Sequence, residues 1–337
     1  MKALLSRLTI DPYIAAILGM VALASVLPVH GRATVVASDA SMAVIALMYF
    51  LQGARLAPKA ALAGARHWRL HTIVLSSTFL LFPLLGLTAR ALAPGLLTPP
   101  LWGGLLMLSV LPSTVQSSIA FTSIARGNVP AALCAATASN LFGIVLTPLL
   151  AGMLLRTQSA FSAGGVSDIV LQLLLPFAAG QLARPWIGEW VGRNKQLVGL
   201  VDRGSILLVV YVAFSEGVTH GIWHQIDATH LMSLALLDAA LLAAVLLATT
   251  GISRLFGFSR ADEITIVFCG SKKSLASGLP MASVLFSGQS LGLVVLPLML
   301  FHQIQLMVCA ALARRYGAQA MQARMSVQGT PAVAMAE

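Results

Sequence analysis

The sequence predicts an all-α membrane protein, and three observations support this fold class. Only 9% of the 337 residues are charged and 58% are hydrophobic, whereas a soluble domain carries about 25% charged residues. The apolar residues form long runs, each able to cross about 30 Å of hydrocarbon as a helix. The basic residues collect between alternate runs. A globular enzyme and a nucleic-acid-binding domain are therefore both excluded.

Hydropathy predicts ten transmembrane helices. The first apolar run follows Lys2 and Arg7 and so imitates a signal peptide, but we interpret it as the first span because the count of ten requires it. The predicted spans are Pro12–Val29, Val35–Gln52, Leu70–Leu92, Leu101–Ile124, Pro130–Leu155, Ile169–Leu182, Ser205–Thr219, Leu231–Thr250, Ile264–Phe286 and Leu291–Ala313.

The basic residues predict the orientation of the chain. With ten spans both termini lie on one face, and that face collects most of the 21 Lys and Arg residues, while the other holds Arg32, Arg90 and Arg156. Because basic loops stay in the cytoplasm, we expect both termini to be cytoplasmic in a multi-pass plasma-membrane protein. The net charge of +10 then reflects orientation in the lipid bilayer and needs no nucleic-acid partner.

Two lysines interrupt the ninth predicted helix, in the stretch Gly270-Ser271-Lys272-Lys273-Ser274-Leu275-Ala276-Ser277-Gly278. An ammonium near the centre of a bilayer costs about 2.5–3.5 kcal/mol on insertion scales, and such residues mark functional sites. The flanking glycines and hydroxyls predict a broken helix, which a membrane protein tolerates only beside a cavity or inside its core.

A second short motif predicts an internal repeat. Gln116-Ser117-Ser118-Ile119-Ala120 in the fourth span aligns with Lys272-Lys273-Ser274-Leu275-Ala276 in the ninth, 156 positions later. Each repeat would hold five spans, and an odd number inverts the second copy, which is a recurrent transporter plan. We therefore expect one transmembrane domain over 10–317, with repeats at about 10–160 and 166–316, and a disordered tail over 318–337.

Several motifs resemble those of the bile acid:sodium symporter family. Leu111-Pro112-Ser113-Thr114-Val115-Gln116-Ser117-Ser118 and Ala125-Arg126-Gly127-Asn128-Val129 are similar to its helix four–five region, and Phe301-His302-Gln303 is similar to its helix-ten element. The Ser-Lys-Lys-Ser stretch is closest to the branch that holds the seventh member of the vertebrate solute-carrier 10 family and its bacterial relatives. The resemblance runs from about residue 10 to 316.

The resemblance implies a four-helix panel and a six-helix core, with helices four and nine broken where they cross. It implies that an organic anion binds between panel and core, and that sodium ions beside the crossing drive symport in a bacterial inner membrane. By position, Ser117, Ser118, Ser139 and Asn140 fall at sodium-ligand places. No resident cofactor is implied, and the coupling ion is sodium or a proton.

The chain departs from this pattern at the ion site. Phe268 stands where sodium-coupled members have a glutamate, and Lys272 and Lys273 replace a glutamine and an asparagine. Sodium needs several oxygen ligands and is repelled by an ammonium, so these changes place sodium coupling in question.

Three interpretations of the lysines compete. One ammonium could occupy the place of the coupling ion, bonded to the oxygens of Ser117, Ser118, Ser139 and Asn140, and exchange of its proton would permit proton coupling. The pair could instead bind an anionic substrate, helped by a half-helix N-terminus. In the purely structural interpretation the lysines pair with the membrane carboxylates Glu216 and Asp238.

The remaining candidate residues lie in two places. His302 and Gln303 in the tenth span could relay a proton or help fill the ion site. In full, the candidate substrate- or ion-binding set is Ser113, Thr114, Gln116, Ser117, Ser118, Ser139, Asn140, Ser271, Lys272, Lys273, Ser274, His302 and Gln303. At the outer end of the seventh span, His220, His224, Asp227 and His230 could chelate a metal, although their spacing matches no strong motif and polar loop residues are the favoured interpretation.

The leading functional prediction is a secondary active transporter of a small or amphipathic organic anion. No Gly-rich phosphate loop ending in Gly-Lys-Ser/Thr is present, which argues against ATP hydrolysis. A non-transporting membrane sensor is the alternative. An intramembrane hydrolase built on Ser271 with Lys272, or Ser274 with Lys273, is less favoured. The identity of the substrate, the direction of transport and the oligomeric state are left open by the sequence.

Overall fold

A computed structural model describes residues 12–55, 67–155, 163–219, 221, 227–286 and 291–328. Throughout these ranges the secondary structure is helical, without a strand, which confirms the predicted all-α class. Six helices are long and apolar enough to cross a membrane, namely Arg32–Arg55, Trp68–Leu92, Val129–Leu155, Lys195–Thr219, Ala228–Leu255 and Leu291–Gln322. The chain is therefore a multi-pass membrane protein.

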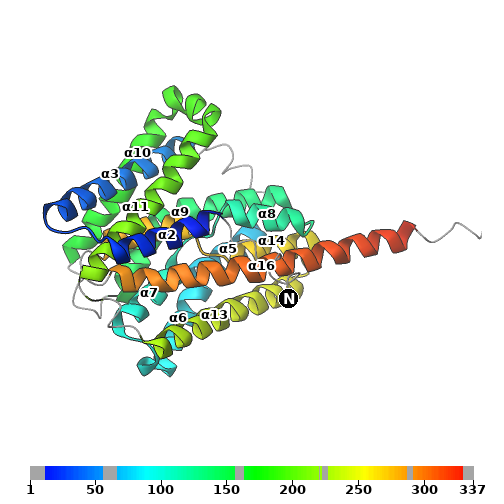
Figure 1. Cartoon of the computed structure of the whole chain (residues 1–337). Helices are drawn as coiled ribbons and strands as arrows, with labels where there is room; N and C mark the ends of the chain where they lie inside the picture. The colour runs from blue at the N-terminus through cyan, green and yellow to red at the C-terminus, as the bar shows by residue number, and fades with distance from the viewer. Residues whose placement is uncertain are drawn as a thin grey trace, which may run out of the picture.

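Helix occupies all ten ranges predicted from the sequence (Figure 1). The elements are α2 (Pro12–Val26), α3 (Arg32–Arg55), α5 (Trp68–Ser76), the π-helical turn η2 (Ser77–Leu81), α6 (Phe82–Leu92), the 3₁₀ turn η3 (Pro94–Leu96), α7 (Pro99–Val110), α8 (Gln116–Ile124), α9 (Val129–Leu155), α10 (Ala163–Arg193), α11 (Lys195–Thr219), α13 (Ala228–Leu255), α14 (Arg260–Gly270), α15 (Leu275–Leu285) and α16 (Leu291–Gln328).

The structure differs from the predicted ranges in length. The helices α10 and α11 are longer than the spans predicted at 169–182 and 205–219. The last helix, α16, continues to Gln328 and so passes residue 317, where the domain was expected to end. Residues 329–337 of the expected tail lie outside the described residues.

Local sequence signals account for several helix starts. Pro99 and Pro100 open α7, where a missing backbone N–H is harmless. Asp227 caps α13 by accepting from the His230 backbone N–H at 2.7 Å, and Ser259 caps α14 by accepting from the Asp262 N–H at 3.2 Å. Both are typical N-cap residues.

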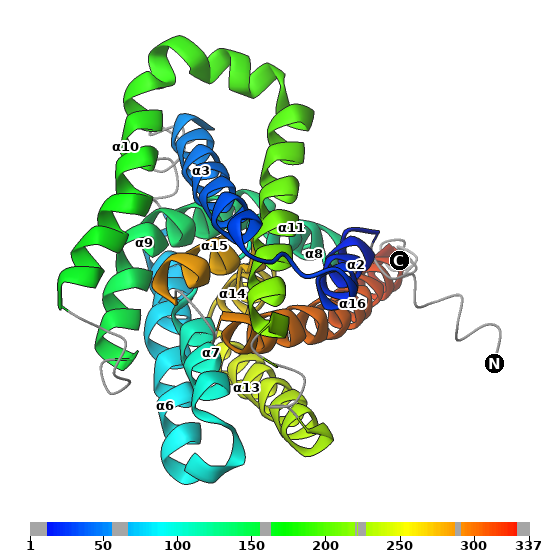
Figure 2. The ribbon, with the colours of Figure 1, turned by 60° about the vertical axis from the view of Figure 1, so that its left-hand side comes forward.

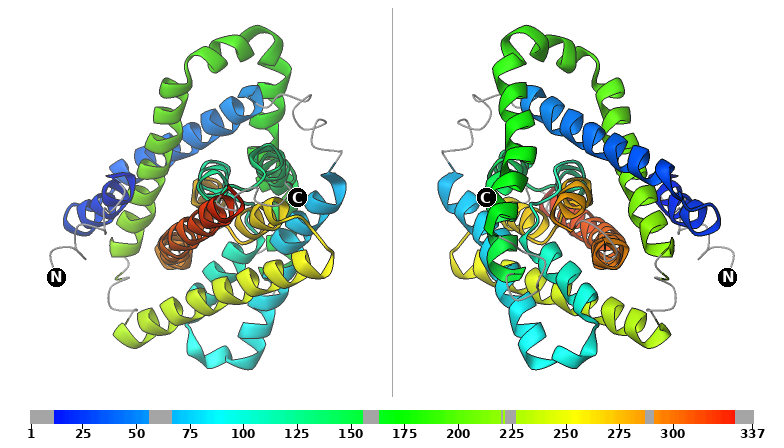
Figure 3. Two further views of the ribbon diagram at one scale, coloured as in Figure 1. Left: turned by 90° about the vertical axis from the view of Figure 1, so that its right-hand side faces the viewer. Right: turned by 90° about the vertical axis from the view of Figure 1, so that its left-hand side faces the viewer.

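Four helices from different parts of the chain, α2, α3, α10 and α11, form one group, hereafter the four-helix group (Figure 2). The helices α3 and α10 approach closely because both contribute a glycine. A Cβ on Gly53 would lie 2.1 Å from the Phe177 carbonyl oxygen, and one on Gly180 would lie 1.9 Å from that of Phe50. Figure 3 shows this group on one side of α16, with α6 and α13 on the other.

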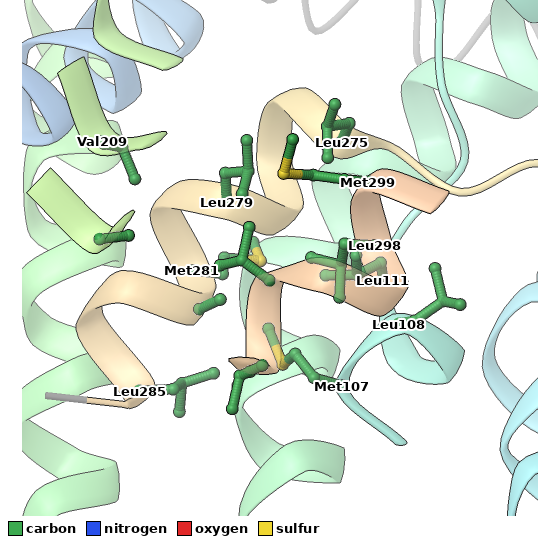
Figure 4. Packing of buried hydrophobic residues seen from close by; sticks show 14 of the residues in the cluster. Met107, Leu108, Leu111, Val209, Leu275, Leu279, Met281, Leu285, Leu298 and Met299 are labelled. Carbon is green, nitrogen blue, oxygen red and sulfur yellow. The ribbon is translucent and has the colours of Figure 1, made fainter. Parts of the chain in front are cut away.

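The largest apolar cluster lies between the four-helix group and the rest of the molecule. Figure 4 shows part of this cluster, which includes Leu279 of α15, Leu298 of α16 and Leu111, which follows α7. These three leucines are at most 1% exposed. The cluster therefore includes residues from both interrupted helices and from α16.

Candidate functional site

The first interruption separates α7, which ends at Val110, from α8, which begins at Gln116. A broken helix leaves carbonyls without intrahelical partners, and α9 supplies donors for two of them. The Thr147 hydroxyl donates to the Val110 carbonyl at 2.8 Å, and the Asn140 amide donates to the Ser113 carbonyl at 2.7 Å. The Ser113 N–H in turn donates to the Ser139 hydroxyl at 3.0 Å. Two of the predicted site residues thus hold the broken backbone in place.

The second interruption separates α14, which ends at Gly270, from α15, which begins at Leu275. The four residues between them, 271–274, are all buried. Ser274 caps α15 by accepting from the Ser277 N–H at 3.2 Å. Gln305 of α16 binds both backbone groups of Lys273, accepting from its N–H at 2.9 Å and donating to its carbonyl at 2.8 Å. Gln305 therefore anchors the backbone of the broken segment to the neighbouring helix.

The two interruptions contact each other. The Ser274 N–H donates to the Pro112 carbonyl at 2.8 Å, and the Ser118 hydroxyl lies 3.4 Å from the Phe268 carbonyl. The halves before the breaks end at Val110 and Gly270, which are 160 positions apart, and those after the breaks begin at 116 and 275, which are 159 apart. The motif alignment predicts an offset of 156 positions, so these spacings differ from the prediction by about one helical turn.

Lys273 points its ammonium at the C-terminal end of α7. Its Nζ donates to the carbonyls of Thr78 at 2.7 Å, Ser109 at 2.7 Å and Leu111 at 2.8 Å, and it lies 4.1 Å above the Phe82 ring. Three acceptors match the three donors of an ammonium. A cation also suits the negative end of a helix dipole. The expected hydroxyl partners are replaced by backbone carbonyls.

Lys272 has a different environment, although it is adjacent in sequence. Its side chain is 0% exposed, and its Nζ has no hydrogen-bond partner among the described residues. The Nζ lies 3.7 Å above the Phe121 ring of α8 and 6.0 Å from the centre of the Phe268 ring of α14. Phe268 thus forms one wall of an apolar cage around this amine.

The hydroxyls of the first interruption bond mainly to one another. Thr114 Oγ1 lies 2.5 Å from Ser117 Oγ and 3.3 Å from Ser118 Oγ, and Ser113 Oγ lies 3.4 Å from Ser118 Oγ. Gln116, by contrast, is exposed at the first position of α8. The structure therefore brings these four hydroxyls together and leaves Gln116 at their edge.

The two predicted residues of α16, His302 and Gln303, differ in whether they connect to the second interruption. His302 is joined to the Lys273 segment through Gln305, whose Nε2 lies 2.9 Å from His302 Nδ1. Gln303 is half-buried and forms none of the hydrogen bonds at the interruptions. The side chain that reaches the break is Gln305, which sequence reasoning did not place in the site.

The membrane carboxylates do not reach the Lys273 ammonium, whose acceptors are the three carbonyls. Asp238 of α13 is 0% exposed, and neither of its carboxylate oxygens has a hydrogen-bond partner among the described residues. Glu216 is half-buried on α11. No ion pair between a lysine and Asp238 occurs in the described part of the chain.

The weak metal candidates do not assemble in the described residues. His220 and His224 lie outside the described ranges. Asp227 and His230 form the N-cap of α13, where the hydrogen bond from the His230 backbone N–H lowers the pKa of the Asp227 carboxyl. No cluster of three metal-binding side chains occurs in the part of the chain that the structure describes.

Neither proposed Ser-Lys dyad has the geometry of a nucleophile and its base. The Ser271 hydroxyl donates to the Val267 carbonyl at 2.6 Å, and the Ser274 hydroxyl donates to Ser277 Oγ at 3.1 Å. Neither serine is bonded to a lysine amine, because Lys273 is turned toward its three carbonyls and Lys272 toward the rings.

The Ala-Arg-Gly-Asn motif connects α8 to the start of α14. Arg126 adopts a positive φ of 60°, which lets the Gly127 N–H close α8 on the Thr122 carbonyl at 2.8 Å. Asn128 then donates through its amide to Asp262 at 2.8 Å, and its backbone N–H donates to the Ala261 carbonyl at 3.1 Å. This motif therefore joins the two broken helices a second time.

Comparison with known proteins agrees with this architecture. The profile of the SBF-like CPA transporter family matches residues 11–318. The chain is 53% identical over 310 residues to the Pseudomonas aeruginosa protein named "Uncharacterized protein PA2026", covering 91% of this chain and 92% of the relative. It is 51% identical over 314 residues to "Putative symporter YfeH" of Escherichia coli K12, covering 93% and 95%. It is 27% identical over 294 residues to "Sodium/bile acid cotransporter 7" of Danio rerio, covering 85% and 84%. On these findings, the chain belongs to the SBF-like CPA transporter family.

Proposed function

We propose that this chain is a secondary active transporter of a small or amphipathic organic anion, and that it works without sodium. Membership of a transporter family supports transport rather than catalysis. The four-helix group would serve as the panel and the remaining helices as the core. Alternating access would then come from rocking of one against the other.

The spacing of the helices supports a ten-span inverted repeat. Four helices of the first half begin at residues 68, 99, 116 and 129, and the corresponding helices of the second half begin at 228, 260, 275 and 291. These starts are 159 to 162 positions apart. Five spans in each half would invert the second copy, and the distribution of basic residues favours cytoplasmic termini.

The position of the Lys273 ammonium is the main observation that supports transport without sodium. It binds three carbonyls at 2.7–2.8 Å, one of which belongs to Leu111 at the first interruption. A sodium ion about 4 Å from this charge would be repelled by about 4 kcal/mol at an effective dielectric constant of 20. We therefore treat the Lys273 ammonium as a cation that is fixed in the chain. It lies in the region where sodium-coupled relatives would bind a sodium ion.

The charge of the second interruption supports the proposed substrate class. The second interruption carries two amines, and no carboxylate pairs with the Lys273 amine. An anion approaching the crossing from the side of the four-helix group would be attracted by this excess positive charge. With sodium displaced, a proton is the remaining candidate for the coupling ion.

Transport by the purified chain in proteoliposomes tests the proposal. Radiolabelled taurocholate, benzoate and succinate serve as probes for steroid, aromatic and dicarboxylate anions. We expect a pH gradient to drive uptake of at least one probe, at the same rate in sodium and choline buffers. A requirement for sodium, or no flux of any probe with folded protein, would contradict the proposal.

A matched pair of variants tests the role of the fixed cation. Lys273→Asn removes the ammonium and supplies a carboxamide oxygen, so we expect its transport to become sodium-dependent. Lys195→Asn removes an exposed lysine from the start of α11 and should behave like the parent.

A further inference from the structure

The two adjacent lysines differ in what surrounds their amines. The Lys273 amine has three carbonyl acceptors, whereas the Lys272 amine has none among the described residues. Both side chains are at most 1% exposed, so solvent cannot account for the difference.

The number of acceptors decides which protonation state each site fits. A charged ammonium has three N–H donors, and a neutral amine has two. Loss of a proton from Lys273 would leave one of its three carbonyls without a donor, which is unfavourable in a buried site. Lys273 is therefore held in the charged state.

Lys272 has no such restriction. Aromatic faces attract a cation, and the Phe121 ring centre lies 3.7 Å from its Nζ. The same surroundings also suit a neutral amine, because no acceptor is left unmatched when the proton leaves. The site therefore accommodates both states.

The other titratable groups near Lys272 do not fix its charge. The thiols of Cys269 on α14 and Cys309 on α16 lie close enough to interact with its charge. The helices α8 and α15 contain no ionisable residue. The acids of α14 lie in its first turn, where the Glu263 carboxylate is paired with Arg254 and Arg260. On α16, Tyr316 packs against the Phe268 ring at 6.2 Å, and Arg260 lies 4.5 Å above the Tyr316 ring.

These rings also separate Lys272 from one end of the molecule. Phe121 lies 6.0 Å from Phe268, which contacts Tyr316, so the aromatic contacts continue from the amine toward the start of α14. Proton exchange toward that end would require these side chains to move. A barrier of this kind is what coupling to a conformational change requires.

We propose that Lys272 is the residue that takes up and releases the coupling proton, whereas Lys273 remains permanently charged. This inference rests on the proposed function and assigns its ion coupling to one amine.

Nuclear magnetic resonance of the full chain labelled with [ε-¹³C]lysine tests this assignment without a ligand. The chain has only five lysines, and Lys2→Arg, Lys59→Arg and Lys195→Arg identify three of the signals. We expect one of the two remaining signals to shift between pH 5.5 and 9, and to be absent from Lys272→Gln. The other signal, from Lys273, should not move. A static Lys272 signal, or a shifting Lys273 signal, would overturn the proposal.

A transport measurement separates this inference from the proposed function. For any probe that the parent carries, the stimulation of uptake by a pH gradient should be at least tenfold smaller in Lys272→Gln than in the parent. The exchange of labelled for unlabelled probe should be unchanged in this variant. Full stimulation in Lys272→Gln would refute the role of Lys272 and leave sodium-independent transport intact. Absence of transport in the parent would refute the proposed function, and the lysine signals would still decide whether Lys272 exchanges its proton.

Discussion

The two helix interruptions are built from opposite chemistry. The first, at 111–115, is neutral, partly exposed and rich in hydroxyls and carbonyls, whereas the second, at 271–274, is fully buried and carries two amines. The first supplies acceptors and the second supplies the donor that meets them, since the Lys273 ammonium binds the Ser109 and Leu111 carbonyls. The comparison indicates that one half of the chain provides the oxygen site and the other half provides its cation.

The largest expected effect on stability is a difference between substitutions of the two lysines. Lys273→Met leaves three buried carbonyls without a donor, so we expect a loss of about 3–5 kcal/mol in the free energy of unfolding. Lys272→Met removes an amine that has no acceptor, so it should be neutral or stabilising. Unfolding by SDS in detergent micelles measures both, and equal losses would show that the two amines are equivalent.

A smaller effect is expected at α16. Gln305→Leu removes the two hydrogen bonds to the Lys273 backbone, at 2.9 and 2.8 Å, and should cost about 2–3 kcal/mol. Gln303→Leu is the matched control, and we expect a change within about 0.5 kcal/mol. If Gln303→Leu proved the more damaging, the second interruption would be held differently from this description.

The packing of the first interruption gives a third test. A Cβ on Gly143 of α9 would lie 2.7 Å from Pro112 Cβ, so Gly143→Val should displace the broken segment and cost about 2 kcal/mol. Gly199→Val is the control, because a Cβ at that position meets nothing within 4 Å. Equal unfolding free energies for the two variants would argue against close packing around Pro112.

The smallest expected effect concerns a single capping hydrogen bond. Thr147→Val keeps the shape of the side chain and removes the donor to the Val110 carbonyl, which should cost about 1 kcal/mol. Thr72→Val, at an exposed position of α5, should change stability by less than about 0.5 kcal/mol. If Thr147→Val lost no more stability than Thr72→Val, the Val110 carbonyl at the end of α7 would have another donor.

Much of the fold could be predicted because long apolar runs leave a strong signal. All ten predicted ranges contain helix, and both predicted breaks occur at the polar motifs. The lengths of the helices were less predictable, since α10 continues past its apolar run to Arg193. The offset predicted from the motifs differs from the spacing of the helix ends because only a Ser and an Ala are identical in the two five-residue motifs, and both residue types are common in membrane helices.

The detailed site could not be read from the sequence for physical reasons. The partners of Lys273 are backbone carbonyls, which every residue carries, so the side chains of Thr78, Ser109 and Leu111 do not indicate this contact. Likewise, Gln303 and Gln305 have the same side chain. Only the side of α16 from which each projects decides which one contacts the broken segment.

Binding of sodium to the parent protein tests the central claim most directly. The measurement is the free energy of unfolding in detergent, in 100 mM sodium chloride and in 100 mM choline chloride. A site with a Kd of about 1 mM would add about 2.7 kcal/mol of stability in sodium. With the Lys273 ammonium fixed on its three carbonyls, we predict no difference between the two salts. A sodium-specific gain of that size would contradict the account.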